Sequence, residues 1–257
     1  MLPPLSSVKK ALNVLEAFSD DRTELGVTQI AELLNSHKSS ISRILMTLLA
    51  EGFVEKNPQT NKYRLGLKMV ELGYRALKRF DLEELATPFL EELADKTNEI
   101  IHLAVLDKNE IIYSDKRGKE QVLTVATRIG GRHPAYCSAM GKVLLAGLSQ
   151  ERLNEVLAIE PLRRFTPTTI TQVTILRKEL ERVRKQGFAI DNEESFPGIR
   201  CVAAPVYDRN GKIVAALSVT APRQRMGQER LKEIRELVVE TARSISRRRG
   251  MNAAETE

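Results

Sequence analysis

Apolar positions between residues 27 and 54 repeat with the spacing of two short helices. The first set lies three or four residues apart, as on one helix face: Val27, Ile30, Ala31 and Leu34. After a polar run at 35–38 a second set follows with the same spacing: Ile41, Ile44, Leu45 and Leu48. The pattern predicts a helix-turn-helix whose second helix begins near Ser39 and stops at Gly52, since glycine adopts the left-handed conformation readily.

Small and polar side chains occupy the opposite face of the second helix. They are Lys38, Ser39, Ser40, Ser42, Arg43 and Thr47. Hydroxyl groups form hydrogen bonds with base edges or phosphates, and arginine binds a guanine edge with two hydrogen bonds. The N-terminus of a helix attracts phosphate. We therefore expect a recognition helix in the major groove of DNA, assisted by Thr28 as N-cap of the first helix. The alternative is an ordinary helical hairpin with a solvated, serine-rich face.

Two strand-like runs follow the second helix directly. Residues 52–56 and 62–65 flank the turn-forming run 57–61, which predicts a β-hairpin. A hairpin in this position is a wing, and Lys56, Lys62 and Arg64 would bring positive charge to backbone phosphates. The other interpretation is an edge hairpin whose charges only keep it soluble.

Two more amphipathic helices flank this module. The first is expected to be capped by Ser6 or Ser7 and to bury Val8, Ala11, Leu12, Leu15 and Phe18. The second, over 67–80, is expected to be a linker helix with Leu67, Val70, Tyr74 and Leu77 on one side. This apolar stripe either pairs with a second copy of the chain or packs on its own domain.

From Glu99 onward the periodicity becomes that of strands. We expect strands over 100–106, 111–113, 122–127, 188–191, 201–207 and 212–220. Helices are expected over 138–147, 149–158, 171–186 and near the C-terminus. A further helix is expected after a capping box at Asp81, and Pro88 should kink this helix or shift its start. The fold class is therefore α+β with a mostly antiparallel sheet. The expected divisions are 4–66 for the winged module, 67–80 for the linker, 81–250 for a sensor domain and 251–257 for a disordered tail.

Composition narrows the class of protein. The 257 residues are 42% hydrophobic and 29% charged, which is typical of globular domains. No apolar run reaches the ~18 residues of a membrane span, and the N-terminus lacks the pattern of a secretion signal. We therefore expect a cytoplasmic protein without a membrane partner.

Charge supports a local basic patch more than a basic protein. The net charge is +6 and the pI is about 9.3. Residues 1–66 hold eight Lys and Arg against seven Asp and Glu, whereas residues 36–64 hold five against two. We expect Asp20, Asp21 and Glu24 to lie away from the DNA-binding face.

A second candidate site lies in the sensor domain. A glycine-rich turn at 130–131 leads into the helix that begins near Ser138, so the backbone N–H groups of Ala139 and Met140 suit a carboxylate. Strand alternation places four further side chains where they are expected to converge: Asp191, Cys201, Ser218 and Thr220. They would bond the hydroxyl or keto end of a small organic acid.

The cysteine and histidine residues leave three other kinds of chemistry open. A thiol-dependent hydrolase would use Cys137 or Cys201 with His133 or His102 as the base. A metal-responsive regulator would use His133, Cys137 and Cys201, although two cysteines without a CxxC spacing are a weak zinc signal. A redox-responsive regulator would require the two sulfur atoms to lie close together.

The chain resembles the IclR family of transcriptional regulators from end to end. The resemblance rests on the helix-turn-helix and hairpin, on the join at 63–66, and on the runs from Gly130 to Lys142 and from Asp191 to Val206. It implies a winged helix-turn-helix, a linker helix and a GAF-like effector-binding domain. It also implies a homodimer, often a tetramer on DNA, and a non-enzymatic regulator without a cofactor, for which we expect repression of a DNA operator.

The resemblance also implies roles for the sensor-domain residues. An effector would sit against the backbone at Ala139 and Met140. The positions of the side-chain contacts are those of Asp191, Cys201, Ser218 and Thr220. Ala139 stands where several relatives carry glycine, which keeps the backbone donor but narrows the pocket.

Overall fold

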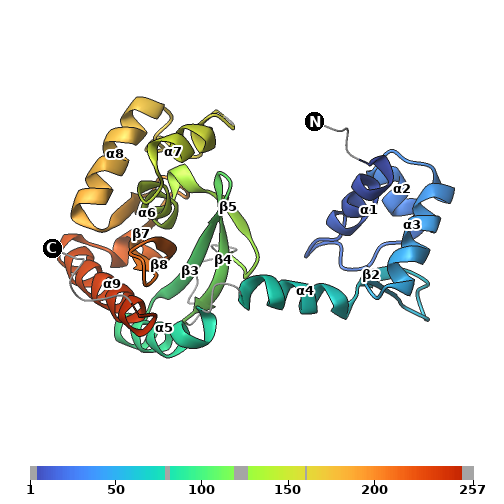
Figure 1. Ribbon diagram of the computed structural model, residues 1–257, viewed down its shortest axis with the longest axis horizontal. Helices are drawn as coiled ribbons and strands as arrows, with labels where there is room; N and C mark the ends of the chain where they lie inside the picture. Colours follow the sequence, from blue (N-terminus) through green and yellow to red (C-terminus); the bar gives the residue numbers. More distant parts are fainter. Residues whose placement is uncertain (1–4, 79–81, 119–126, 160, 251–257) are drawn as a thin grey trace. The chain divides into compact units, whose positions relative to one another are not determined.

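The computed structural model of the chain describes residues 5–78, 82–118, 127–159 and 161–250 (Figure 1). The chain divides into two compact units, Met1–Arg79 and Phe80–Glu257. The helix expected to be a linker falls in the first unit. The tail at 251–257, most of the strand expected at 122–127 and Asp81 of the expected capping box lie outside the described residues.

The first unit is a helix-turn-helix followed by a β-hairpin, as predicted. Its elements are α1 (Ser6–Glu16), α2 (Val27–Leu33), α3 (Lys38–Ala50), β1 (Val54–Lys56), β2 (Tyr63–Leu65) and α4 (Leu67–Lys78). The apolar stripes of α2 and α3 meet in one core that includes Ile30, Ile41 and Leu45. Gly52 ends α3 with a φ of +76°, so the predicted stop is confirmed.

Three predictions about the first unit are wrong in detail. Val8 and Leu12 are 52% and 54% exposed, because α1 packs on α3 through Val14 and the residues just after the helix. The residue that precedes α1 is Leu5, so neither serine is the cap. Thr28 is likewise not a cap: it lies inside α2, which Gln29 stabilises by accepting a hydrogen bond from the Gly26 N–H (3.0 Å).

The second unit is an α+β domain built on a six-stranded sheet. The strand order is β5-β4-β3-β8-β7-β6 and every neighbouring pair is antiparallel. Its strands are β3 (Ile100–Asp107), β4 (Glu110–Arg117), β5 (Arg132–Pro134), β6 (Ala189–Asn192), β7 (Ile199–Tyr207) and β8 (Ile213–Pro222). The short edge strand β5 was not predicted, because its residues Arg132-His133-Pro134 carry no strand signal.

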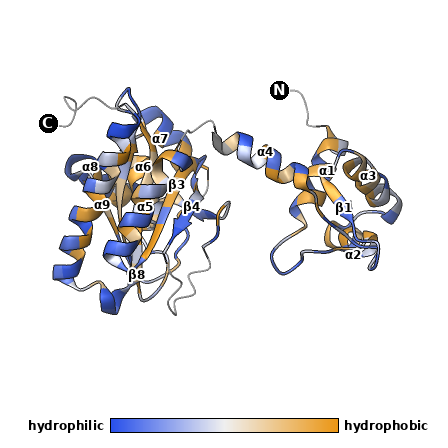
Figure 2. Ribbon diagram, turned by 90° about the horizontal axis from the view of Figure 1, so that it is seen from below, coloured by the Kyte–Doolittle hydropathy of each residue, from blue (hydrophilic) through white to orange (hydrophobic). Residues whose placement is uncertain are grey.

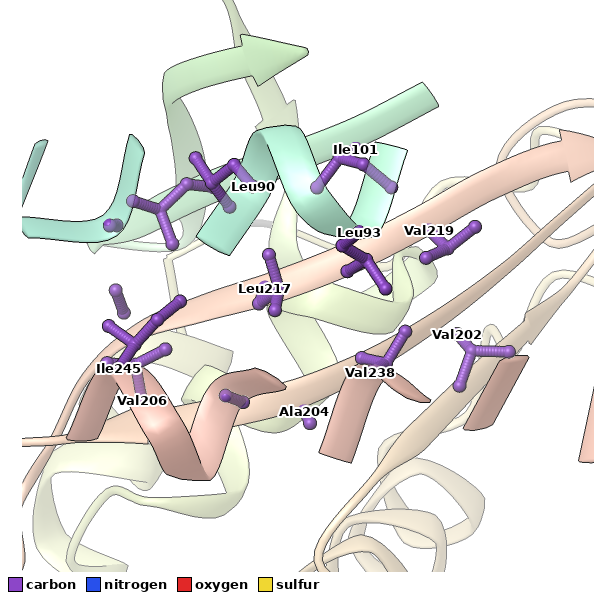
Figure 3. Close-up of a cluster of buried hydrophobic side chains, with 14 of the residues drawn as sticks. Leu90, Leu93, Ile101, Val202, Ala204, Val206, Leu217, Val219, Val238 and Ile245 are labelled. Atoms are coloured by element: carbon purple, nitrogen blue, oxygen red, sulfur yellow. The ribbon is translucent and has the colours of Figure 1, made fainter. Parts of the chain in front are cut away.

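Helices cover both faces of this sheet. On one face α5 (Glu83–Thr97) and α9 (Gln228–Arg248) pack on the strands through a core that includes Leu90, Leu93, Leu217 and Val238 (Figure 3). In Figure 2 α9 carries both hydrophilic and hydrophobic residues, as expected for a helix with one face on a core. Pro88 lies inside α5 and does not move its start.

The other face is covered by three helices and a tight turn. They are α6 (Ala139–Ala146), α7 (Gln150–Leu157), α8 (Val173–Gln186) and the 3-10 turn η1 (Ala135–Cys137). As predicted, Ser149 caps α7 and Gly187 ends α8 with a φ of +75°. At the start of α6 the Ser138 hydroxyl accepts from the Gly141 N–H (3.1 Å). A Cβ at Gly141 would lie 2.0 Å from the Ala135 carbonyl oxygen, so only glycine allows this close approach.

A buried ion pair joins α6 to the segment that follows β6. Every residue of α6 is buried, including Lys142 in the middle of its apolar sequence. The Lys142 ammonium lies 2.5 Å from Glu194 Oε1, 2.5 Å from the Ile190 carbonyl oxygen and 3.7 Å from Glu179. A charged group tolerates such burial only when it is paired and hydrogen-bonded, so these contacts fix α6 relative to β6 and α8.

Candidate functional site

The polar face of α3 lies on the surface of the first unit. Lys38, Ser39, Arg43 and Thr47 are exposed, whereas Ser40 and Ser42 are half-buried. The Thr47 hydroxyl donates to the Arg43 carbonyl oxygen (3.1 Å) within the helix. Thr28 is exposed on α2. Two cations and several hydroxyls are therefore accessible on one element, which the apolar stripe of the same helix anchors to the core.

The hairpin carries charges of both signs. Lys56 is exposed and its ammonium lies 5.9 Å from the centre of the Tyr63 ring, while Lys62 is half-buried. The Arg64 guanidinium pairs with Glu55 on the facing strand (2.9 Å). Glu55 offsets the charge of Arg64, so Lys56 and Lys62 supply the net positive charge of the hairpin.

The expectation that Glu24 lies away from the candidate face is wrong. Its carboxylate accepts hydrogen bonds from Asn57 Nδ2 (2.8 Å) and the Thr60 hydroxyl (3.1 Å) in the hairpin turn. These bonds, the one from Asn57 first, lower the pKa of Glu24. Glu24 therefore holds the turn between β1 and β2. This role could not be predicted from the sequence, because the partners of Glu24 are close to it only in the tertiary fold.

The six residues expected to form a site in the second unit line one small cavity. The cavity lies between the start of α6 and strands β3, β7 and β8, and it includes Ala139, Met140, Asp191, Cys201, Ser218 and Thr220. Its volume is about 20 Å³, which is room for a water molecule. A larger guest requires the lining side chains to move apart.

The start of α6 presents backbone donors to this cavity. The first N–H groups of an α-helix have no acceptor within the helix. The Ser138 side chain and carbonyl take the N–H groups of Gly141 and Lys142. Those of Ala139 and Met140, at the first two positions of α6, remain for another acceptor, with the positive end of the helix dipole behind them.

Asp191 and Ser218 provide the side-chain polarity of the cavity. Asp191 is 2% exposed, and burial raises its pKa to about 7 although its carboxylate accepts the Glu194 N–H (2.6 Å). Among the described residues, the Ser218 hydroxyl has no hydrogen-bond partner, and it is buried. Because a buried polar atom without a partner is costly, this hydroxyl indicates a place for a polar guest. Thr220 donates to the Cys201 sulfur (3.3 Å).

Further lining residues that were not assigned to this site from the sequence include His102, Tyr113, Ser195 and Phe196. The imidazole of His102 bonds Thr127 through Nε2 (2.8 Å) and Thr220 through Nδ1 (3.3 Å). Burial lowers the His102 pKa to about 3, so the ring is neutral and donates one of these bonds while accepting the other. The sequence signal that could have placed His102 in the cavity is strand register, since His102 pairs with Ser218 across β3 and β8.

Cys137 and His133 lie together but lack the properties of a catalytic pair. Their closest atoms, Cys137 Sγ and His133 Nε2, are 3.5 Å apart, and Ser195 bridges them. Burial raises the pKa of the fully buried Cys137 thiol to about 12 and lowers that of His133. Burial also raises the pKa of Cys201. Neither sulfur is an ionised nucleophile at neutral pH.

Among the described residues, no group of three or more His, Cys, Asp and Glu side chains is placed to hold a metal ion. No helix among them is long and apolar enough to cross a bilayer.

Comparison with known proteins gives matches over nearly the whole chain. The family model of the IclR helix-turn-helix domain matches residues 7–58, and that of the bacterial transcriptional regulator IclR C-terminal region matches residues 74–247. The HTH-type transcriptional regulator KdgR of Escherichia coli is 39% identical over 246 residues, which are 96% of this chain and 93% of KdgR. The HTH-type transcriptional repressor AllR of Salmonella typhi is 31% identical, over 95% of this chain and 90% of AllR.

A solved structure of similar shape contains a ligand. It is an IclR homolog from Microbacterium hydrocarbonoxydans complexed with 4-hydroxybenzoate, with a TM-score of 0.85 and 27% identity over 95% of this chain and 99% of that one. Family models cover both units and the relatives match end to end. The chain therefore belongs to the IclR family of bacterial transcriptional regulators, with an N-terminal helix-turn-helix domain and a C-terminal IclR domain.

Proposed function

We propose that the protein is an operator-binding repressor that a small carboxylate controls through the cavity at the start of α6. The observation that carries the effector part is the meeting of two helix-end N–H groups with Asp191 and an unpartnered Ser218 hydroxyl. The relative AllR is named a repressor, and the homolog bound to 4-hydroxybenzoate holds a carboxylate. The protein needs no cofactor for this function and works in the cytoplasm, where operator DNA lies.

On DNA, α3 is the recognition helix. The residues at its start contact backbone phosphates; they are Lys38, Ser39 and Ser40. The residues further along contact base edges; they are Ser42, Arg43 and Thr47. Thr28 on α2 and Lys62 on the hairpin add backbone contacts. Arg64 joins them only by exchanging Glu55 for a phosphate, so its contribution to affinity is smaller than that of Lys62.

In the cavity, the carboxylate of the effector accepts from the N–H groups of Ala139 and Met140. Its hydroxyl or keto end meets Asp191, Ser218 and Thr220, and the Cys201 thiol lies beside them. Neutral His102 keeps the Thr220 hydroxyl in place. Binding changes operator affinity only if two arrangements of the protein bind the effector unequally, and a coupling of roughly 1–3 kcal/mol is sufficient.

The functional unit is a homodimer, with a tetramer on DNA as the larger assembly. Helix α4 leaves one apolar stripe exposed within the first unit, with Leu67 75%, Val70 65% and Tyr74 54% exposed. Monomers rarely leave such a stripe open to water. A second copy covers it, and two recognition helices then meet half-sites about 10 bp, or a multiple of that, apart.

Replacing Arg43 with alanine tests the recognition helix. We expect operator affinity to fall by about 1–3 kcal/mol per lost base contact and base choice to relax at one position in each half-site. Arg22→Ala, at an exposed arginine outside α3, is the control and keeps the wild-type binding. Equilibrium DNA-binding titrations with randomised operators make the measurement; an R43A protein with wild-type affinity and base preference refutes this role.

Replacing Val70 with aspartate tests the dimer. A charge in an apolar interface is costly, so V70D is expected to sediment as a monomer at micromolar concentration and to lose cooperative operator binding. Leu33→Asp alters an exposed leucine of α2 and leaves both properties unchanged. If V70D sediments as the wild-type oligomer does, α4 is not the interface.

Asp191 predicts a pH dependence of effector binding. Its pKa of about 7 means that the carboxyl is mostly neutral below pH 7 and ionised above it. An anionic effector is repelled by the ionised form, so its dissociation constant is expected to rise up to tenfold per pH unit above pH 7. Calorimetry between pH 6 and 8, with a carboxylate selected by thermal-shift screening, measures this.

The matched variants decide whether Asp191 is responsible. Asp191→Asn removes the pH dependence, whereas Glu240→Gln at an exposed position of α9 keeps it. Wild-type affinity that is constant or increases from pH 6 to 8 contradicts the proposed arrangement. So does an unchanged pH dependence in D191N.

A further inference from the structure

A second, larger hollow lies at the other end of the same helix and strands. It has a volume of about 380 Å³ and lies between the last turns of α6 and α8 and the hairpin that joins β7 to β8. Residues from all three elements line it, among them Val143, Val183, Arg184, Pro205, Tyr207 and Lys212. We call this hollow the hairpin groove. Sites that take small organic ligands have volumes of ≈300–1,000 Å³, so its size is sufficient.

The hairpin groove is separate from the proposed effector cavity. The two share no lining residue. Helix α6 contributes its start to the cavity and its later turns to the groove, and β7 likewise contributes Cys201 to the cavity and Pro205 and Tyr207 to the groove. Between them on this side of the sheet lie Ala203 and Ala216, packed in the core.

The inner surface of the groove is apolar. Val143, Val183 and Pro205 belong to helices and a strand whose positions the core fixes, so this surface does not depend on a loop. The turn after α6 lies close to β8 where both line the groove: a Cβ on Gly147 would lie 2.8 Å from Ile213.

Two cations flank the apolar surface. The Arg184 guanidinium donates from Nε to the Ala146 carbonyl oxygen (2.8 Å) and from Nη2 to that of Leu148 (3.1 Å), which holds the group at the end of α6. Lys212 extends from the hairpin. In the part of the chain that the structure describes, neither forms an ion pair, and no Asp or Glu lines the groove.

We propose that the hairpin groove binds an amphipathic carboxylate, a small organic acid with an aromatic or short acyl body. The body would replace water on the apolar surface formed by Val143, Val183 and Pro205. The carboxylate would take the free guanidinium edge of Arg184 and the ammonium of Lys212. A neutral or cationic ligand would provide no negative charge to pair with Arg184 and Lys212. The proposal concerns a site apart from the effector cavity and does not rest on the role proposed for that cavity.

The test uses the full-length protein and 2-naphthoate as the probe, an apolar bicyclic ring with one carboxylate. Fluorescence titration is expected to show one saturable site per chain. Lys212→Glu is expected to weaken it at least tenfold, because it places a negative charge where the carboxylate binds. Lys232→Glu makes the same charge change at an exposed position of α9 and leaves the affinity unchanged.

Two further variants separate the possible sites. Arg184→Gln weakens binding in the same direction as K212E; since Arg184 also supports the end of α6, thermal melting checks its fold. Asp191→Ala lies in the effector cavity and keeps wild-type affinity for 2-naphthoate. A carboxylate that binds at the effector cavity instead has the same affinity in wild type and K212E, and its affinity changes in D191A because the charge of Asp191 is removed.

Four outcomes overturn the proposal. Three are the absence of saturable binding up to millimolar 2-naphthoate, equal affinities in wild type and K212E, and a changed affinity in D191A. A K212E protein that sediments differently from wild type without the probe also overturns it, because the groove is then covered by a second copy of the chain.

Discussion

The buried ion pair between Lys142 and Glu194 is the constraint on which the second unit depends. A lysine enclosed by apolar residues keeps its charge only with a partner, and loss of one member of such a pair costs about 3–5 kcal/mol. The same ammonium bonds the Ile190 carbonyl, so its contacts flank Asp191 in the chain. The start of α6 and Asp191 therefore keep a fixed separation, and the two halves of the cavity remain in register.

The sheet supplies the third side of the cavity by simple geometry. In β8 alternate residues point to the same face, so Ser218 and Thr220 lie together and meet His102 and Cys201 of the neighbouring strands. The Ser218 hydroxyl, which has no partner in the described part of the chain, a neutral imidazole and an acid whose pKa is raised to about 7 then share a small volume. This arrangement stabilises the fold less than an apolar packing would, which is typical of a binding site.

Local patterns in the sequence were sufficient for the helix-turn-helix, the hairpin and most strands, which follow from periodicity and turn residues acting over a few positions. The meeting of Asp191, Cys201, Ser218 and Thr220 combines alternation within each strand with the pairing of β6, β7 and β8. The failures are tertiary. Val8 and Leu12 face outward because α3 packs against the other side of α1. Glu24 bonds Asn57, 33 residues away, and Lys142 bonds Glu194, 52 residues away. Such partners leave no local signal.

The backbone amides of Ala139 and Met140 offer the most direct measurement. A carboxylate selected by thermal shift is added stepwise to the ¹⁵N-labelled full-length protein, and ¹⁵N–¹H spectra are recorded at each step. If the carboxylate binds at the start of α6, the Ala139 and Met140 amide protons shift downfield in a saturable way, and their shifts are larger than those of amides elsewhere on the sheet. Unchanged Ala139 and Met140 signals at saturating ligand would contradict the account, because the carboxylate would then lie elsewhere.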